Sequence, residues 1–133
     1  MKQQSPTKYL YKREVLLSFA DAVSKTKEEL AKEGFGILTE IDVKATLKKK
    51  LGIDHDNYII LGACNPPLAH KALMSEKDIG LLLPCNLIVY EDGIKVYLST
   101  IVPSVAMGMI ENPDLAEIAK DVDEKLKRVV DAV

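Results

Sequence analysis

The chain has 133 residues, of which 47% are hydrophobic and 29% are charged. This length suits one ordinary domain, and the balance of apolar and charged residues excludes an intrinsically disordered chain. The net charge is -2 and tryptophan is absent, so the sequence lacks both the basic field and the stacking surfaces of a nucleic-acid-binding protein.

No apolar run reaches the length of a membrane span, and the polar first residues do not resemble a signal peptide. We therefore expect a cytoplasmic protein with a disordered tail at residues 1–7 and a single domain at residues 8–133. Two cysteines in a domain of this size do not indicate a disulfide scaffold.

The first half of the chain alternates between strand and helix patterns. Apolar residues at every second position, such as Tyr11 and Val15, predict half-exposed strands. Ser18 and Asp42 are typical helix N-caps, and Gly34 is a typical residue for ending a helix. We expect a strand at 8–17, a helix at 19–33, a strand at 35–41 and a helix at 43–51.

The second half begins with an unbroken apolar run at 58–64, which predicts a central strand buried on both faces. Asn65 and the two prolines after it predict the start of a helix that ends near Ser75. Strands at 81–90 and 94–100 would form a hairpin around Gly93, with Pro84 causing a bulge or marking an edge. An apolar stripe of helical period predicts a long last helix after Asn112.

This order of elements, β-α-β-α-β-α-β-β-α, predicts the α+β class. We expect a two-layer structure in which helices pack on a mixed β-sheet of about five strands.

The standard catalytic motifs are absent, and the remaining candidates are two Cys-Asn pairs and one histidine between them. Cys64 ends the predicted central strand just before a helix, where the helix dipole would favour a thiolate, but the two prolines remove amide donors from that helix end. A buried, inert cysteine is the alternative reading for Cys64, and it is favoured more strongly for Cys85.

His70 lies off the centre of the apolar stripe of its helix, so its side chain is expected to point outward. That direction suits a plain surface residue, a subunit contact, or a metal or haem ligand. Cys64, Cys85 and His70 would bind zinc or iron only with a fourth ligand or a second subunit, so they are weak metal candidates.

Glu40 and Asp42 lie at the end of a predicted strand, where a carboxylate could act as an acid, a base or a ligand. Helix capping is the alternative for Asp42, and an ion pair with Lys44 is the alternative for Glu40. Met107 and Met109 suggest an apolar flap over a pocket or partner, or simple core filling.

Four segments of the chain closely resemble the domain of unknown function 302 family: Gly34–Gly52, Ile60–Leu73, Ile79–Asn86 and Asn112–Leu115. The resemblance covers almost the whole chain from Lys8. It implies a small α+β domain that forms homodimers in prokaryotes and has no assigned activity.

The family pattern falls on positions that include the candidates above: Glu40, Asp42, Lys44, Cys64, Asn65, Pro66, His70, Pro84, Cys85, Asn86, Asn112 and Pro113. The segment at 102–110 departs from it, because family members often carry an aspartate before the proline that here follows Val102.

Three hypotheses follow. The first is a homodimeric binding or accessory module whose small-ligand pocket is lined by a set of seven residues: Glu40, Lys44, Cys64, Asn65, His70, Cys85 and Asn86. The second is a thiol-dependent or metal-assisted enzyme in which Cys64 is nucleophile or ligand, His70 is base or ligand, and Glu40 is the acid. The third is a purely structural dimer. The first two require the two cysteines to share one cavity.

Overall fold

The computed structural model describes residues 9–133, and the expected N-terminal tail lies outside them. Five strands form one sheet in the order β1-β5-β4-β3-β2. The strands are β1 (Leu10–Val15), β2 (Gly36–Asp42), β3 (Tyr58–Cys64), β4 (Cys85–Asp92) and β5 (Lys95–Ile101). The helices are α1 (Phe19–Lys32), α2 (Val43–Leu51), α3 (Pro66–Ser75), the 3-10 helix η1 (Lys77–Leu82), α4 (Pro103–Ala106) and α5 (Pro113–Ala132).

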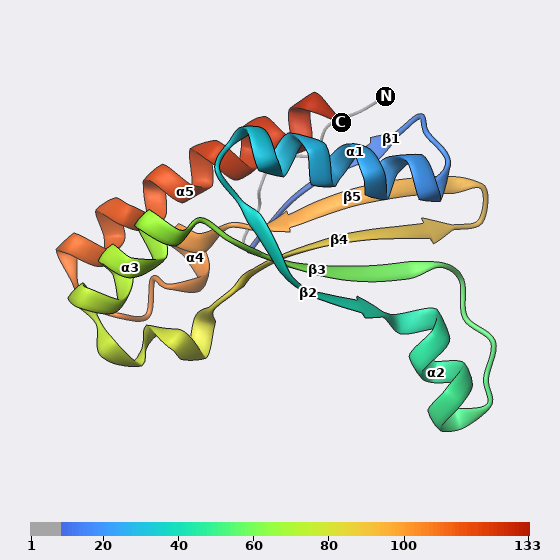
Figure 1. The fold of residues 1–133 in the computed structure, drawn as a ribbon, viewed down its shortest axis with the longest axis horizontal. Coiled ribbons are helices and arrows are strands. Elements are labelled where there is room, and N and C mark those ends of the chain that lie inside the picture. Colours follow the sequence, from blue (N-terminus) through green and yellow to red (C-terminus); the bar gives the residue numbers. More distant parts are fainter. Residues whose placement is uncertain (1–8) are drawn as a thin grey trace.

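The α+β class and the order of elements are confirmed, but the expectation of a mixed sheet is wrong. Every neighbouring pair of strands is antiparallel. The reason is visible in Figure 1, where α2 and α3 lie beyond opposite ends of β3 instead of running back along the sheet. A helix placed beyond the strand ends acts as a long hairpin connection, so the next strand returns antiparallel.

Helices α1 and α5 cover one face of the sheet (Figure 1). The core between these layers contains leucines with no solvent exposure, including Leu30, Leu87, Leu98 and Leu126. A second, smaller cluster joins α3, η1 and α5 beyond the end of β3, and it includes Ala72, Ile79, Leu115 and Ala119. Burial of apolar side chains on this scale is the main stabilising term of such a fold.

The predicted strand at 81–90 begins too early. Residues up to Leu82 form η1, and β4 begins only at Cys85, after a cis peptide bond between Leu83 and Pro84. Proline has no amide to donate to a strand ladder, which explains why the strand begins after it. Pro84 is neither a bulge nor an edge residue, because it precedes β4 and β4 lies between β3 and β5.

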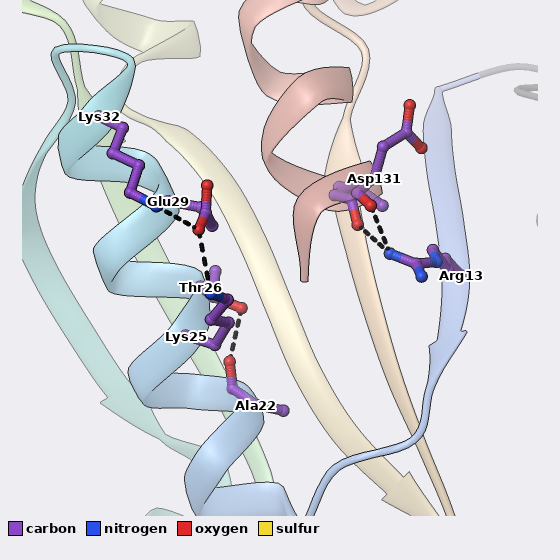
Figure 2. Close-up of polar contacts among 8 residues, drawn as sticks. Arg13, Ala22, Lys25, Thr26, Glu29, Lys32 and Asp131 are labelled. Carbon is purple, nitrogen blue, oxygen red and sulfur yellow. Dashed lines mark hydrogen bonds and ion pairs between the residues drawn. The ribbon is translucent and has the colours of Figure 1, made fainter.

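Side chains fix the ends of several helices. Ser18 and Asp42 cap α1 and α2 as predicted, and Gly52 ends α2 with a positive φ. Arg13 on β1 donates to the carbonyl oxygens of Val130 and Asp131 at 2.8 and 2.9 Å, which satisfies the last turn of α5 (Figure 2). The long last helix therefore docks its carboxyl end against the edge strand β1.

Helix α1 carries a local network that Figure 2 shows. Thr26, which is fully buried, donates its hydroxyl proton to the carbonyl oxygen of Ala22 at 2.7 Å. Glu29 pairs with Lys25 and Lys32 at 3.3 and 2.9 Å, and the hydrogen bond from Lys32 lowers the pKa of Glu29. Within residues 9–133, no helix combines the length and apolar character needed to cross a membrane.

Candidate functional site

A cavity lies where the two apolar clusters meet, among the end of β3, the start of β4 and the helices α3, α4 and α5. Its volume is about 40 Å³, which is room for about three water-sized groups. The lining is almost entirely apolar, with Phe35, Leu68, Ala72, Leu115, Ala119 and Val122 among its walls. Both cysteines border it, and we call it the thiol cavity.

The antiparallel ladder brings the two cysteine residues to the same end of the sheet. Ala63 on β3 is the register partner of Cys85 on β4, and Cys64 follows Ala63 directly. Cys64 is half-buried, and Cys85 is buried. Neither forms a disulfide, and both residues line this one cavity.

The environment of Cys85 makes its thiol a poor nucleophile at neutral pH. Burial, together with smaller like-charge contributions from the nearby Cys64 and Asp123, raises the pKa of Cys85 to about 11. A thiol with that pKa carries almost no thiolate at neutral pH. Burial of this residue agrees with the inert reading favoured for it.

Asn65 borders the thiol cavity, but its amide is already engaged. Its Oδ1 accepts from the amide of Leu68 at 3.4 Å, and its Nδ2 donates to the carbonyl oxygen of Glu33 at 3.1 Å. Asn65 therefore joins the start of α3 to the end of α1. Gly34 makes this possible, because it has a φ of 85° and a Cβ there would lie 3.1 Å from Nδ2 of Asn65.

His70 points away from the thiol cavity, as its position on the helix predicted. It is exposed and lines a shallow surface hollow between α3 and α5, together with Lys71, Asp114, Glu117 and Asp121. Cys64 and His70 therefore border different spaces, and the structure does not bring them together as a nucleophile and its base.

Glu40 and Lys44 also lie away from the thiol cavity. Glu40 is exposed on β2 and pairs with Lys27 of α1 at 3.0 Å, in place of the Lys44 partner weighed from the sequence. Lys44 lines a shallow hollow beside α2 with Asp54, His55 and Asp56. Asp42 serves as the cap of α2, with its Oδ1 accepting from the amide of Ala45 at 2.9 Å.

Asn86 is exposed on β4, where its register partner is Gly62. Because Leu87 beside it is fully buried and neighbouring residues of a strand face opposite ways, Asn86 lies on the face that α1 and α5 leave uncovered. A Cβ at Gly62 would collide with Thr39 and Pro84, so the glycine permits close packing there. Asn86 therefore does not line the thiol cavity, although the adjacent Cys85 does.

No set of three or more His, Cys, Asp or Glu side chains in residues 9–133 is arranged to hold a metal ion. The suggested combination of Cys64, Cys85 and His70 is therefore not assembled. Met107, which is buried, also lines the thiol cavity.

Comparison with known proteins agrees with this architecture. The model of the domain of unknown function DUF302 matches residues 11–133. The chain belongs to the DUF302 family. A solved structure of an uncharacterized conserved DUF302 protein from Bacillus stearothermophilus is similar to it, with a TM-score of 0.88 and 31% sequence identity. The similarity covers 93% of this chain and 97% of that chain. The search of curated proteins finds no match.

Some residues of this DUF302 site have only weak signals in the sequence. The sequence suggests a flap or core role for Met107, but its position in the lining of the thiol cavity depends on packing between distant segments. Asp123 does not line the cavity, but its charge acts on Cys85, and it was not among the candidates chosen from the sequence. It is a buried carboxylate on α5 whose Oδ1 accepts from the amide of Ser104 at 3.0 Å. An acid next to Val122 in the apolar stripe of α5 was the available signal.

Proposed function

We propose that this DUF302 protein is a cytoplasmic homodimeric module that binds a small apolar guest in the thiol cavity. The observation that supports the binding role most directly is that Cys64 and Cys85 border one cavity with an apolar lining. Two free cysteines also suit a reducing compartment.

The dimensions of the thiol cavity define the guest. A volume of about 40 Å³ admits a molecule with only a few heavy atoms, and the engaged amide of Asn65 offers it little hydrogen bonding. Apolar cavities of this kind take up apolar guests because no buried polar group must be desolvated. A binding role is thus favoured over the thiol enzyme, whose base and acid candidates lie elsewhere.

Xenon is a suitable probe for the guest. We expect xenon pressure to shift the methyl NMR signals of Leu115 and Ile118 on the cavity wall. Ala119→Leu should abolish these shifts by filling the space, because Ala119 is buried and lines the cavity. Ala116→Leu is the matched control on the same helix, because Ala116 is exposed and is not part of this lining. Unchanged wall signals in the wild type would contradict the proposal.

The homodimer is supported by the face of the sheet opposite α1 and α5. Tyr58, Tyr90 and Tyr97 form a ladder there with ring centroids 5.3 and 5.4 Å apart. The edge strand β2 exposes Leu38 and Ile41, and α2 buries none of its residues. An apolar surface of this kind in a water-soluble protein is typical of a subunit interface.

Sedimentation analysis tests the homodimer. The wild type should have twice the chain mass of 14.7 kDa. Ile88→Lys should yield monomers with an unchanged circular dichroism spectrum, because Ile88 alternates with the buried Leu87 and Val89 and so lies on the open face. Ala116→Lys, on the helical side, should leave the dimer intact. A wild-type monomer at all concentrations would exclude the dimer.

A further inference from the structure

The thiol cavity shares a wall with a hollow at the surface of the molecule. We call the segment at 102–112, which joins β5 to α5 and includes α4, the strap (Figure 1). The hollow lies between the strap and the first turns of α5, and its volume is about 490 Å³. Met107 and Ala119 line both the hollow and the thiol cavity. Both residues are buried, so they form a partition between the two spaces.

The Met107 half of this partition is built to move. A methionine side chain is unbranched and flexible, so it changes shape at low cost. Its backbone is also held locally, because the amides of Met107, Gly108 and Ile110 donate to carbonyl oxygens within the strap itself. Segments with such local hydrogen bonds open more easily than the core of a fold. Ala119, in contrast, is a fixed part of the long helix α5.

Side-chain hydrogen bonds fasten the strap on both sides of Met107. The amide of Ser104 donates to Oδ1 of Asp123 on α5 at 3.0 Å. Nδ2 of Asn112 donates to the carbonyl oxygen of Ser75 on α3 at 2.9 Å. The middle of the strap can therefore shift while its two ends stay attached to the helices.

A second partition separates the thiol cavity from the hollow that His70 lines, and it is stiffer. Leu68 and Ile118 line both of these spaces. The amide of Leu68 is held by the cap of α3, Asn65, at 3.4 Å. Ile118 lies within α5, where a β-branched side chain has one strongly preferred rotamer. Movement at this partition would have to disturb two packed helices, whereas movement at Met107 disturbs only the strap.

We infer that Met107 is the gate of the thiol cavity and that the small apolar guest enters from the hollow beside the strap. The inference rests on the proposed function in taking this cavity as the binding site, and it adds the route of entry and the residue that controls it. Motion of a gate sets how fast a guest enters and leaves. Obstructing the route slows entry and exit equally, so the affinity for the guest stays the same.

The test measures the exchange rate of bound xenon by saturation-transfer NMR on the full chain. Ala116→Phe places a ring in the hollow outside Met107 and should slow exchange by about 10-fold, because it obstructs the route. Glu117→Phe is the matched control at the next position of α5. Glu117 is also exposed, but it lines the hollow beside His70, so this variant should change the rate by less than about two-fold.

Met107→Ala removes the gate itself and should accelerate exchange by about 10-fold or more. Unfolding curves show whether this variant at a buried position keeps its fold, and the two exposed phenylalanine variants decide the route without it. Slower exchange in Glu117→Phe but not in Ala116→Phe would overturn the inference, as would equal rates in both variants and the wild type. Absence of bound xenon from the wild type would overturn the proposed function and the gate together, whereas the other contrary results would overturn the gate alone.

Discussion

The residues around the two ends of strand β3 differ in how deeply they are buried. At its carboxyl end, Cys64 lines a cavity that is also bordered by residues of α3 and α5. At its amino end, α2 buries none of its residues and exposes Lys44, Lys48 and Lys50 to solvent. Burial at the carboxyl end changes the chemistry of the groups there, since it raises the pKa of Cys85 to about 11. Charged groups at the amino end of β3 remain hydrated, so the carboxyl end is the better candidate for a functional site.

The largest expected contrast is in stability. Leu126 on α5 has no solvent exposure, so Leu126→Ala should lower the free energy of unfolding by about 2–5 kcal/mol. Leu51 on α2 is 66% exposed, and Leu51→Ala should cost about 0.5 kcal/mol or less. Urea unfolding of both variants measures the difference. Equal losses would mean that α2 is buried in solution, for example in the dimer.

The second contrast concerns the two thiols. Raising the pKa of Cys85 from 9.0 to about 11 lowers its thiolate fraction about 100-fold at neutral pH. Cys64 is also more accessible, so iodoacetamide at neutral pH should label it much faster than Cys85. Labelling of Cys85 should accelerate as the pH approaches 11. Mass spectrometry of digested protein measures both rates, and equal labelling at neutral pH would contradict the burial of Cys85.

The third contrast concerns Asn65 and Asn86, which each follow a cysteine in the sequence. Asn65→Ala removes both the cap of α3 and the bond to the carbonyl oxygen of Glu33, so it should cost about 1–2 kcal/mol. Asn86→Ala changes an exposed residue on the open face of the sheet and should cost about 0.5 kcal/mol or less. Thermal unfolding compares them. A neutral Asn65→Ala would show that the joint between α1 and α3 contributes little.

The smallest expected effect is a pH dependence at Glu33. The hydrogen bond from Arg128 at 2.9 Å lowers the pKa of Glu33 below its ordinary value of 4.5. A pKa that is lower in the folded state stabilises the fold at pH values above the pKa of the unfolded state. This stabilisation is lost as the pH falls through the pKa of the folded state. Wild type should therefore exceed Glu33→Gln slightly in stability at pH 7, and the difference should vanish in acid. A difference that persists in acid would point to another cause.

The sequence predicted the elements well where local chemistry decides them. Ser18, Asp42 and Asn65 each cap the helix that follows, because a cap needs only residues within one turn. It failed at Leu81, where an apolar run resembled a strand although the residue is 88% exposed on η1. It also failed on strand direction, because whether a helix runs along the sheet or beyond it depends on tertiary packing.

The candidate site was half predictable. Cys64 and Cys85 come to the same end of the sheet because β3 and β4 pair in a register that sets Ala63 opposite Cys85. His70, Glu40 and Lys44 were chosen for their chemistry alone, and the fold places them on other surfaces. Met107 reaches the site only through the packing of α4 against α5, which no local pattern encodes.

A crystal structure of the protein under xenon pressure tests the central claim most directly. We predict a xenon peak in the cavity bordered by Cys64, Cys85 and Met107, and its loss in crystals of Ala119→Leu. Xenon bound only at other positions, with these three side chains packed against one another, would contradict the claim that a guest enters between the two thiols.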